Sequence, residues 1–130
     1  MTVKSEVIQT AEAPAAIGPY SQALRVGPWI LLSGQIALDP RSGSLVGQSA
    51  GTQAGHCLEN ARAVLRAAGA ELAHVVRAVL YLRDMADFEE VNRVYGQFFR
   101  EHPPARTTVQ VTALPRGAAV EIELTAYRES

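Results

Sequence analysis

The sequence predicts an α+β fold in which a mixed β-sheet has two helices packed on one face. Two segments carry apolar residues at helical spacing, and each is followed by an apolar, β-branched segment. The chain also begins and ends with a pair of strand-like segments separated by a turn. The resulting order is strand, strand, helix, strand, helix, strand, strand, which is typical of a sheet with its helices on one side.

The size and charge of the chain limit its class. Its 130 residues fit a single domain spanning 1–130, and 48% hydrophobic with 19% charged residues is typical of a folded protein. A net charge of −1 and a single lysine, Lys4, argue against a nucleic-acid partner. No segment has the roughly 20 apolar residues of a membrane span, so no membrane partner is expected. A lone cysteine, Cys57, and an N-terminus unlike a signal peptide predict a cytoplasmic protein.

The first third of the chain predicts an irregular segment followed by a hairpin. Residues 12–19 (EAPAAIGP) are rich in alanine, proline and glycine and are expected to turn tightly. Strands are predicted at 21–26 and 29–36, and Gly27-Pro28 between them has the length of a hairpin turn.

A helix is predicted over residues 49–68, with Gly69 as the residue that ends it. One face of this helix carries Ala54, Leu58, Ala61, Leu65 and Ala68. The apolar run 75–82 then predicts a buried strand. A second helix is predicted over 87–100, with Asp87 and Glu90 forming a capping-box variant at its start.

The last two strands, 105–113 and 118–126, are predicted to form a hairpin around Leu114–Gly117. Matching their apolar alternation places Gln110 opposite Glu121 and Thr108 opposite Glu123. Arg106 then shares a polar sheet face with both glutamates. A solvated outer face is the ordinary interpretation of such a surface.

The strand at 75–82 weakens that interpretation, because both of its faces look buried. Val75, Val79 and Tyr81 share one face with a single charged residue, Arg77, and the other face is wholly apolar. One layer of helices covers only one face, so the second face is expected to pack on another subunit. Charged groups near such an interface are partly desolvated, which favours a site that contains Arg106 and Glu121.

Three blocks of sequence resemble the RidA (YjgF) family of reactive-intermediate deaminases. They are residues 13–23 (APAAIGPYSQA), 30–36 (ILLSGQI) and 104–126 (PARTTVQVTALPRGAAVEIELTA). The resemblance implies a fold like that of chorismate mutase, and a homotrimer with three sites between subunits.

The resemblance also implies roles for particular residues. Arg106 of the PAR block would hold a substrate carboxylate, and Glu121, the first glutamate of VEIE, would position the attacking water. The remaining pocket positions would be Tyr20, Ser33, Gly34, Asn92 and Thr108. Archetypal members have cysteine where this chain has Thr108, which makes a thiol-dependent mechanism impossible here.

The implied reaction is hydrolysis of 2-imino acids, such as 2-aminoacrylate and 2-iminobutanoate, to 2-keto acids and ammonia. It requires neither a metal nor an organic cofactor, and the three histidines show no metal-ligand spacing. Alternatives are a non-enzymatic trimer that binds small carboxylates, a deaminase for a different imine, and a ribonuclease, which the charge disfavours. The preferred side chain, the physiological pathway and the effect of Thr108 on rate are not specified by the sequence.

Overall fold

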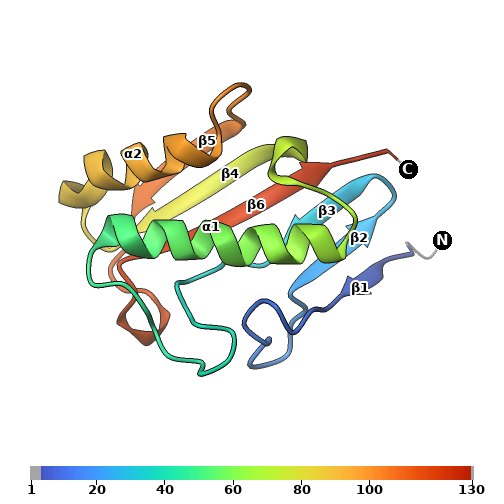
Figure 1. Ribbon diagram of the computed structural model, residues 1–130, viewed down its shortest axis with the longest axis horizontal. Helices are drawn as coiled ribbons and strands as arrows, with labels where there is room; N and C mark the ends of the chain where they lie inside the picture. Colours follow the sequence, from blue (N-terminus) through green and yellow to red (C-terminus); the bar gives the residue numbers. More distant parts are fainter. Residues whose placement is uncertain (1–3, 130) are drawn as a thin grey trace.

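The computed structural model describes residues 4–129, and it confirms a mixed sheet with both helices on one face (Figure 1). The six strands lie in the order β1-β2-β3-β6-β4-β5. They are β1 (Glu6–Ile8), β2 (Ala23–Val26), β3 (Trp29–Leu32), β4 (Val75–Leu82), β5 (Ala105–Gln110) and β6 (Val120–Tyr127). The helices are α1 (Ala50–Ala67) and α2 (Phe88–Phe98). Within residues 4–129, neither helix combines the length and apolar character that a membrane crossing requires.

The predicted first hairpin is present as β2 and β3, which pair from Val26–Trp29 outward. Gly27 lies in the turn with φ +60°, a conformation that glycine adopts without steric cost. The strands are shorter than predicted, because β3 ends at Leu32 and the chain leaves the sheet. Strand β1 was not predicted; its three residues pair with β2 at the edge of the sheet.

Helix α1 agrees closely with the prediction. The Ser49 hydroxyl caps its start by accepting a hydrogen bond from the Thr52 N–H at 3.1 Å. Gly69 follows its last residues with φ +81°, as expected of a helix-ending glycine. The predicted apolar face is buried against the sheet.

The predicted capping box of the second helix is wrong. The Asp87 side chain makes no capping hydrogen bond at the start of α2. The Glu90 carboxylate instead accepts a hydrogen bond at 3.1 Å from the N–H of Gly51, in the first turn of α1. A carboxylate stabilises a helix N-terminus, so α2 supports α1 rather than its own start. Gly51 permits this approach, because a Cβ there would lie 2.6 Å from the Glu90 side chain.

The predicted closing hairpin is also wrong. Strand β5 lies at the edge of the sheet and pairs in parallel with β4, with α2 as the crossover between them. Strand β6 lies between β3 and β4 and is antiparallel to both. The reason is burial: β6 has a fully apolar face and needs a central position, whereas most of β5 is polar and tolerates an edge.

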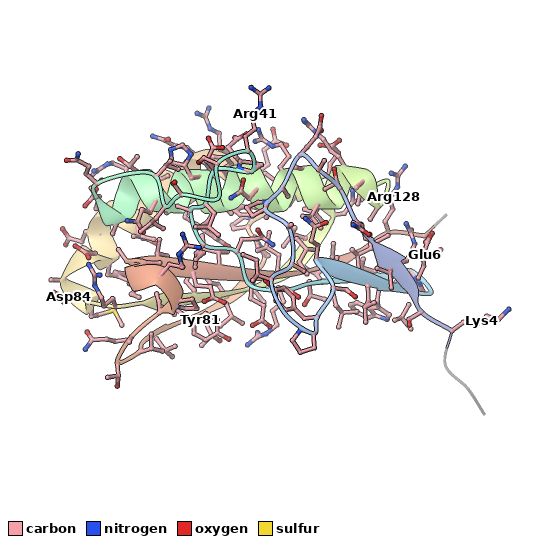
Figure 2. The ribbon with its side chains drawn as sticks, turned by 90° about the horizontal axis from the view of Figure 1, so that it is seen from below. Lys4, Glu6, Arg41, Tyr81, Asp84 and Arg128 are labelled. Atoms are coloured by element: carbon pink, nitrogen blue, oxygen red, sulfur yellow. The ribbon has the colours of Figure 1, made fainter. Side chains whose placement is uncertain are left out.

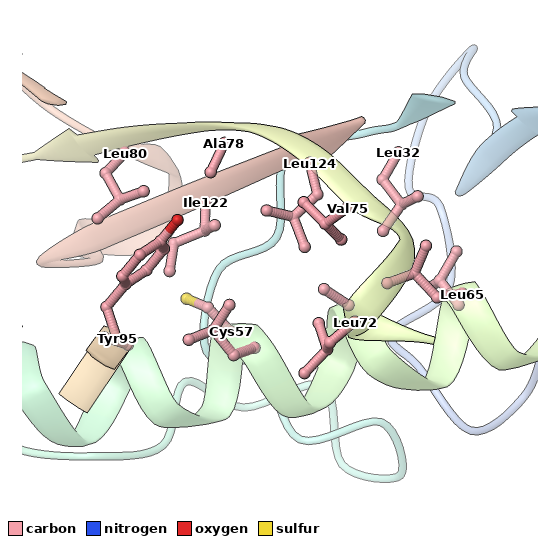
Figure 3. Packing of buried hydrophobic residues seen from close by; sticks show 14 of the residues in the cluster. Leu32, Cys57, Leu65, Leu72, Val75, Ala78, Leu80, Tyr95, Ile122 and Leu124 are labelled. Carbon is pink, nitrogen blue, oxygen red and sulfur yellow. The ribbon is translucent and has the colours of Figure 1, made fainter. Parts of the chain in front are cut away.

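The core lies between the helices and the face of the sheet that they cover (Figure 3). Strand β6 contributes its alternate residues Val120, Ile122, Leu124 and Ala126, each at most 1% exposed. Leu80 of β4 and Cys57 of α1 pack in the same layer, so the thiol is a core group. The opposite face of the sheet, called here the open face, has no helix over it. It carries Leu31, Tyr81, Val109, Glu121, Glu123, Thr125 and Tyr127.

Gln22 fastens the irregular N-terminal segment to the sheet. Its side chain is 4% exposed. Its Oε1 accepts a hydrogen bond from the Thr10 N–H at 2.7 Å, and its Nε2 donates to the carbonyls of Thr10 (3.1 Å) and Pro14 (2.7 Å). One amide therefore satisfies several backbone groups of a segment that has no regular structure of its own.

We predict that Gln22→Ala lowers the free energy of unfolding by about 2–4 kcal/mol, because it leaves backbone groups of residues 10–14 without partners. Urea denaturation at a fixed protein concentration measures the change. Gln9→Ala is the control, since this exposed residue should change stability by less than about 0.5 kcal/mol. Equal stabilities for the two variants would contradict the role of Gln22.

Candidate active site

The residues predicted to form the site fall into two groups, which lie on opposite faces of the sheet. Glu121 belongs to the open face, because Val120 and Ile122 on either side of it are buried beneath the helices. Arg106 of β5 is the register partner of Ala78, a residue of the helix-covered face. The two groups are described in turn as the carboxylate half-site and the guanidinium half-site.

The carboxylate half-site is a cavity of about 590 Å³ at the point where the chain leaves β3. It brings together four of the predicted residues: Tyr20, Ser33, Gly34 and Glu121. Apolar side chains form part of the wall, including Ile17, Leu32, Ile36 and Leu38. Its polar and ionisable groups therefore face a largely apolar surround.

Gly34 packs directly against the carboxylate of Glu121. Backbone hydrogen bonds between Gln35 and Ile122, at 2.8 and 3.0 Å, hold the loop after β3 beside β6. A Cβ built on Gly34 would lie 2.0 Å from Oε2 of Glu121, far inside contact distance. Glycine is needed here because the loop backbone occupies the space beside the carboxylate.

The electrostatic surroundings of Glu121 favour its protonated form. Burial raises the pKa of its carboxyl group above the usual value, and the charge of Glu123 raises this pKa further. Glu123 itself accepts a hydrogen bond from the hydroxyl of Tyr81 at 2.9 Å. Figure 2 shows Tyr81 on the face of the sheet opposite α1, where these carboxylates lie.

Ser33 and Tyr20 are held by the backbone around the cavity. The Ser33 hydroxyl donates to the Ser21 carbonyl at 2.6 Å, so this hydroxyl proton is already engaged. The Tyr20 hydroxyl accepts a hydrogen bond from the Ile17 N–H at 3.2 Å, while the residue as a whole is 53% exposed. Tyr20 is thus an exposed ring that lines the cavity.

The guanidinium half-site lies between β5 and α2. Arg106 donates a hydrogen bond from Nη1 to Oδ1 of Asn92 at 2.7 Å. Its guanidinium also lies over two rings of α2, with its carbon 4.9 Å from the centroid of Tyr95 and 5.6 Å from that of Phe88. These contacts fix the orientation of the guanidinium, and its remaining N–H groups stay available to a ligand.

Two buried hydroxyl oxygens near this arginine have no hydrogen-bond partner among the described residues. One belongs to Thr108, on the same face of β5 as Arg106, and the other to Tyr95. Figure 3 shows the Tyr95 hydroxyl directed from α2 towards Leu80 of the sheet. A buried hydroxyl is costly without a partner, so each is free to bond a ligand or a water molecule.

The prediction that Arg106 and Glu121 share one sheet face is therefore wrong for a single chain. Strand β4 separates their strands, and their register positions on it are Ala78 and Tyr81. Ordinary strand spacing and rise place their Cα atoms about 14 Å apart, with side chains on opposite faces. The predicted contacts of Gln110 and Thr108 with β6 are absent for the same reason, since β4 lies between them.

Several residues of the cavity were not predicted from the sequence. Arg116 and Pro115 line it from a 3₁₀ turn before β6, where Arg116 has φ +61°. Nothing in the sequence singles out that conformation for an arginine. Glu123 could have been predicted from the sequence, because the alternation of a strand places it on the same face as Glu121. Asn92 was predicted as a pocket residue, and in the structure its Oδ1 accepts the hydrogen bond of Arg106, which joins α2 to β5.

The fold and these two half-sites define a class: a small α+β protein with a carboxylate-lined cavity and a separate, oriented arginine. Residues 10–128 match the family model described as Endoribonuclease L-PSP. The chain belongs to this family, also known as the RidA/YjgF family, as its sequence motifs predicted.

Relatives with assigned names agree with this membership. The human 2-iminobutanoate/2-iminopropanoate deaminase is 48% identical over 122 residues, which cover 94% of this chain and 89% of the human protein. Protein DfrA of Myxococcus xanthus is 51% identical over 120 residues, which cover 91% and 92% of the two chains.

Solved structures agree as well. RidA from Psychrobacter is 43% identical and superposes with a TM-score of 0.91 over 94% of this chain and 98% of its own. TdcF of E. coli, solved with bound serine, is 38% identical with a TM-score of 0.90 over 95% and 99% of the two chains. The fold of the family is therefore present in full.

We predict that Gly34→Ala moves the Glu121 carboxylate by about 1 Å or more, because the added Cβ takes its place. Overpacking should also lower the free energy of unfolding by about 1–3 kcal/mol. A crystal structure and urea denaturation of the variant measure the two effects.

Gly96→Ala is the matched control. Gly96 is exposed on α2, and a Cβ there would meet nothing within 4 Å. Alanine should stabilise this helix position by about 0.5–1 kcal/mol. A Glu121 carboxylate that stays in place in Gly34→Ala would show that the loop, rather than the carboxylate, yields.

Proposed function

We propose that this protein hydrolyses 2-imino acids and their enamine tautomers to 2-keto acids and ammonia, at sites formed between two copies of the chain. The observation that carries the proposal is the separation of the two half-sites on opposite faces of one sheet. Each half-site has groups ready to bind a ligand, but neither has all the groups that the reaction needs. The relatives named as imine deaminases supply the class of substrate.

The open face of the sheet supports assembly with further copies. It exposes large apolar side chains, among them Trp29 (45%), Leu31 (47%) and Val109 (38%). Apolar side chains gathered on one face of a sheet, without helices over them, are typical of a subunit interface. A neighbouring copy that covers this face brings its edge strand towards the carboxylate cavity. We propose a homotrimer, the arrangement implied by the family resemblance.

Arg106 serves to hold the substrate carboxylate. A guanidinium binds a carboxylate through two parallel hydrogen bonds, which fix both position and orientation. Asn92 and the aromatic rings of α2 keep the guanidinium from turning away. The Thr108 hydroxyl, which lacks a partner within the chain, is available to bond the same ligand.

Glu121 of the neighbouring copy serves to activate water. Its carboxylate accepts a proton from the water as the water oxygen bonds to the imine carbon, and it returns that proton to the imine nitrogen. The resulting carbinolamine has one hydroxyl and one amino group on the same carbon. Proton transfer from the hydroxyl to the nitrogen then breaks the carbon–nitrogen bond, and ammonia leaves behind a 2-keto acid. The raised pKa of Glu121 suits a group that must both accept and return a proton.

The apolar wall of the cavity suits a short hydrocarbon side chain on the substrate. Leu32 and Leu38 are buried, so this part of the wall is packed against the rest of the protein. An acidic side chain would be repelled by Glu121 and Glu123, and a basic one would have to leave water for this apolar wall. Small neutral imino acids are therefore the substrates we propose, and the reaction needs no cofactor.

A second candidate function is the binding of a small carboxylate without turnover. The bound serine in the related TdcF structure favours it, because serine carries the carboxylate that Arg106 would hold. Measuring both ligand binding and imine turnover in Glu121→Gln separates the two. A binding module keeps its affinity and shows no activity in either form, whereas the enzyme keeps its affinity and loses turnover.

Cleavage of RNA, which the description of the family model suggests, is not proposed. The chain has one lysine and a net charge of −1, and its main cavity contains two glutamates. Such a surface offers little attraction to a phosphate backbone.

We predict that Arg106→Ala and Glu121→Gln are each folded but inactive, and that mixing the two restores activity. Random exchange of equal amounts gives about a quarter of the wild-type activity, because one interface in four then joins an intact arginine to an intact glutamate. An assay of imine consumption, with the imine generated in place by an amino-acid oxidase, measures the recovery.

The control exchanges the double variant Arg106→Ala/Glu121→Gln with Glu121→Gln, which leaves every interface without an intact glutamate. No activity should return in that mixture. Mixed single variants that stay inactive, although mass spectrometry shows that their subunits have exchanged, would exclude a site shared between copies.

A further inference from the structure

Glu123 is a second carboxylate in the cavity of Glu121, and the proposed reaction gives it no task. The two glutamates are separated by one position on β6, so both side chains point to the open face. Both line the same cavity, and both are only partly exposed. Two carboxylates so close together in a partly desolvated space repel each other when both are ionised.

Tyr81 treats the two carboxylates differently. Its register partner on β6 is Glu121, but its hydroxyl donates diagonally to Oε1 of Glu123 at 2.9 Å. A hydrogen bond donated to a carboxylate stabilises the ionised form. Tyr81 therefore stabilises the ionised form of Glu123. The electrostatic repulsion between the two carboxylates then destabilises the ionised form of Glu121.

Other groups of the same chain around Glu121 do not neutralise the negative charge of Glu123. Among residues 4–129, neither glutamate forms an ion pair with a basic side chain. The guanidinium of Arg116 at the rim is exposed and donates to the Gly43 carbonyl at 3.0 Å. The ionisable or charged groups of the same chain that face Glu121 are Glu123 of its own strand, Tyr81 of β4, Tyr20 of the N-terminal segment and Arg116 of the 3₁₀ turn, whereas the Cys57 thiol of α1 lies on the other side of the sheet, in the core. In the proposed assembly the guanidinium of Arg106 of the neighbouring copy also faces this site, where the substrate carboxylate pairs with it.

We propose that Glu123 is a positioning residue whose fixed negative charge, held by Tyr81, makes the Glu121 carboxylate a stronger base towards water. The inference rests on the proposed function, because it assigns Glu121 the proton of the attacking water. Other enzymes also use two neighbouring carboxyl groups whose environments differ. One of the two stays ionised, and the other exchanges a proton with the substrate.

The pH dependence follows from this arrangement. A general base is active when deprotonated, so activity falls as pH drops through the pKa of Glu121. Burial and then the Glu123 charge raise that pKa, so the acid limb of the wild type lies at higher pH than for an unperturbed glutamate. Removing the charge of Glu123 should move the limb to lower pH and leave a weaker base at neutral pH.

Glu123→Gln is the decisive variant, because glutamine keeps the size of the side chain and still accepts the hydrogen bond of Tyr81. Carbon-13 NMR of glutamate carboxyl groups follows the titration of Glu121 directly in the assembled protein. We expect its midpoint at lower pH in Glu123→Gln than in wild type. At pH 8, kcat for imine hydrolysis should fall by roughly two- to tenfold with little change in KM, as for a weakened base.

Glu101→Gln is the matched control, since it removes the same charge from an exposed residue before β5. It should leave both the Glu121 midpoint and kcat unchanged. Tyr81→Phe provides a second variant: it removes the hydrogen bond that holds the Glu123 carboxylate, so the midpoint of Glu121 should fall.

An unchanged Glu121 midpoint in Glu123→Gln would overturn the inference, as would a shifted midpoint with unchanged kcat. Failure of the proposed function looks different: wild-type protein would not hydrolyse imino acids at all. In that case the NMR titration would still show whether the charge of Glu123 shifts the midpoint of Glu121. The proposed role of Glu123 in catalysis would be refuted together with the proposed function.

Discussion

The central position of β6 decides where the groups of the candidate site point. This strand is bonded on both sides, so its alternation cannot slip by one residue without moving a row of apolar side chains out of the core. Val120, Ile122 and Leu124 fix that row beneath the helices. Glu121 and Glu123 are thereby forced onto the opposite face, and the loop held to Ile122 brings Gly34 against the first of them.

The same constraint explains why the two half-sites are separated. With β6 between β3 and β4, both sides of β6 are occupied, and strand β5 pairs with the free edge of β4 instead. Its parallel register sets Arg106 beside Ala78 and Thr108 beside Leu80, on the face that the helices cover. Helix α2 is the crossover that precedes β5, so Asn92 and Tyr95 lie close enough to orient the arginine.

Much of the fold could be predicted from local patterns. Helix α1, strand β4 and the first hairpin follow from periodicity and turn residues, which depend on neighbours in the sequence. The site residues were predicted from the motifs of the family, and four of them, Tyr20, Ser33, Gly34 and Glu121, line one cavity of the structure.

The partner of β5 could not be predicted in this way. Thr107, Val109 and Val111 alternate like a core face, and a four-residue loop suggested a hairpin with β6. In the structure Val109 is 38% exposed on the open face, so its apolar side chain does not belong to the core of the chain. Glu90 was misassigned for a similar reason, because its partner Gly51 is distant in sequence. Patterns of neighbouring residues do not specify which strands pair or which distant residues come into contact.

The division of the half-sites has a consequence for how such a protein behaves in a mixed population. In the proposed assembly, each chain contributes its arginine to a site with one neighbour and its glutamate to a site with another, so it takes part in two sites at once. A subunit that lacks both groups would then silence two sites, so a minority of damaged chains would remove more than its share of activity. Catalysis of this kind would also depend on dilution, since chains that come apart retain their fold but hold only fragments of a catalyst.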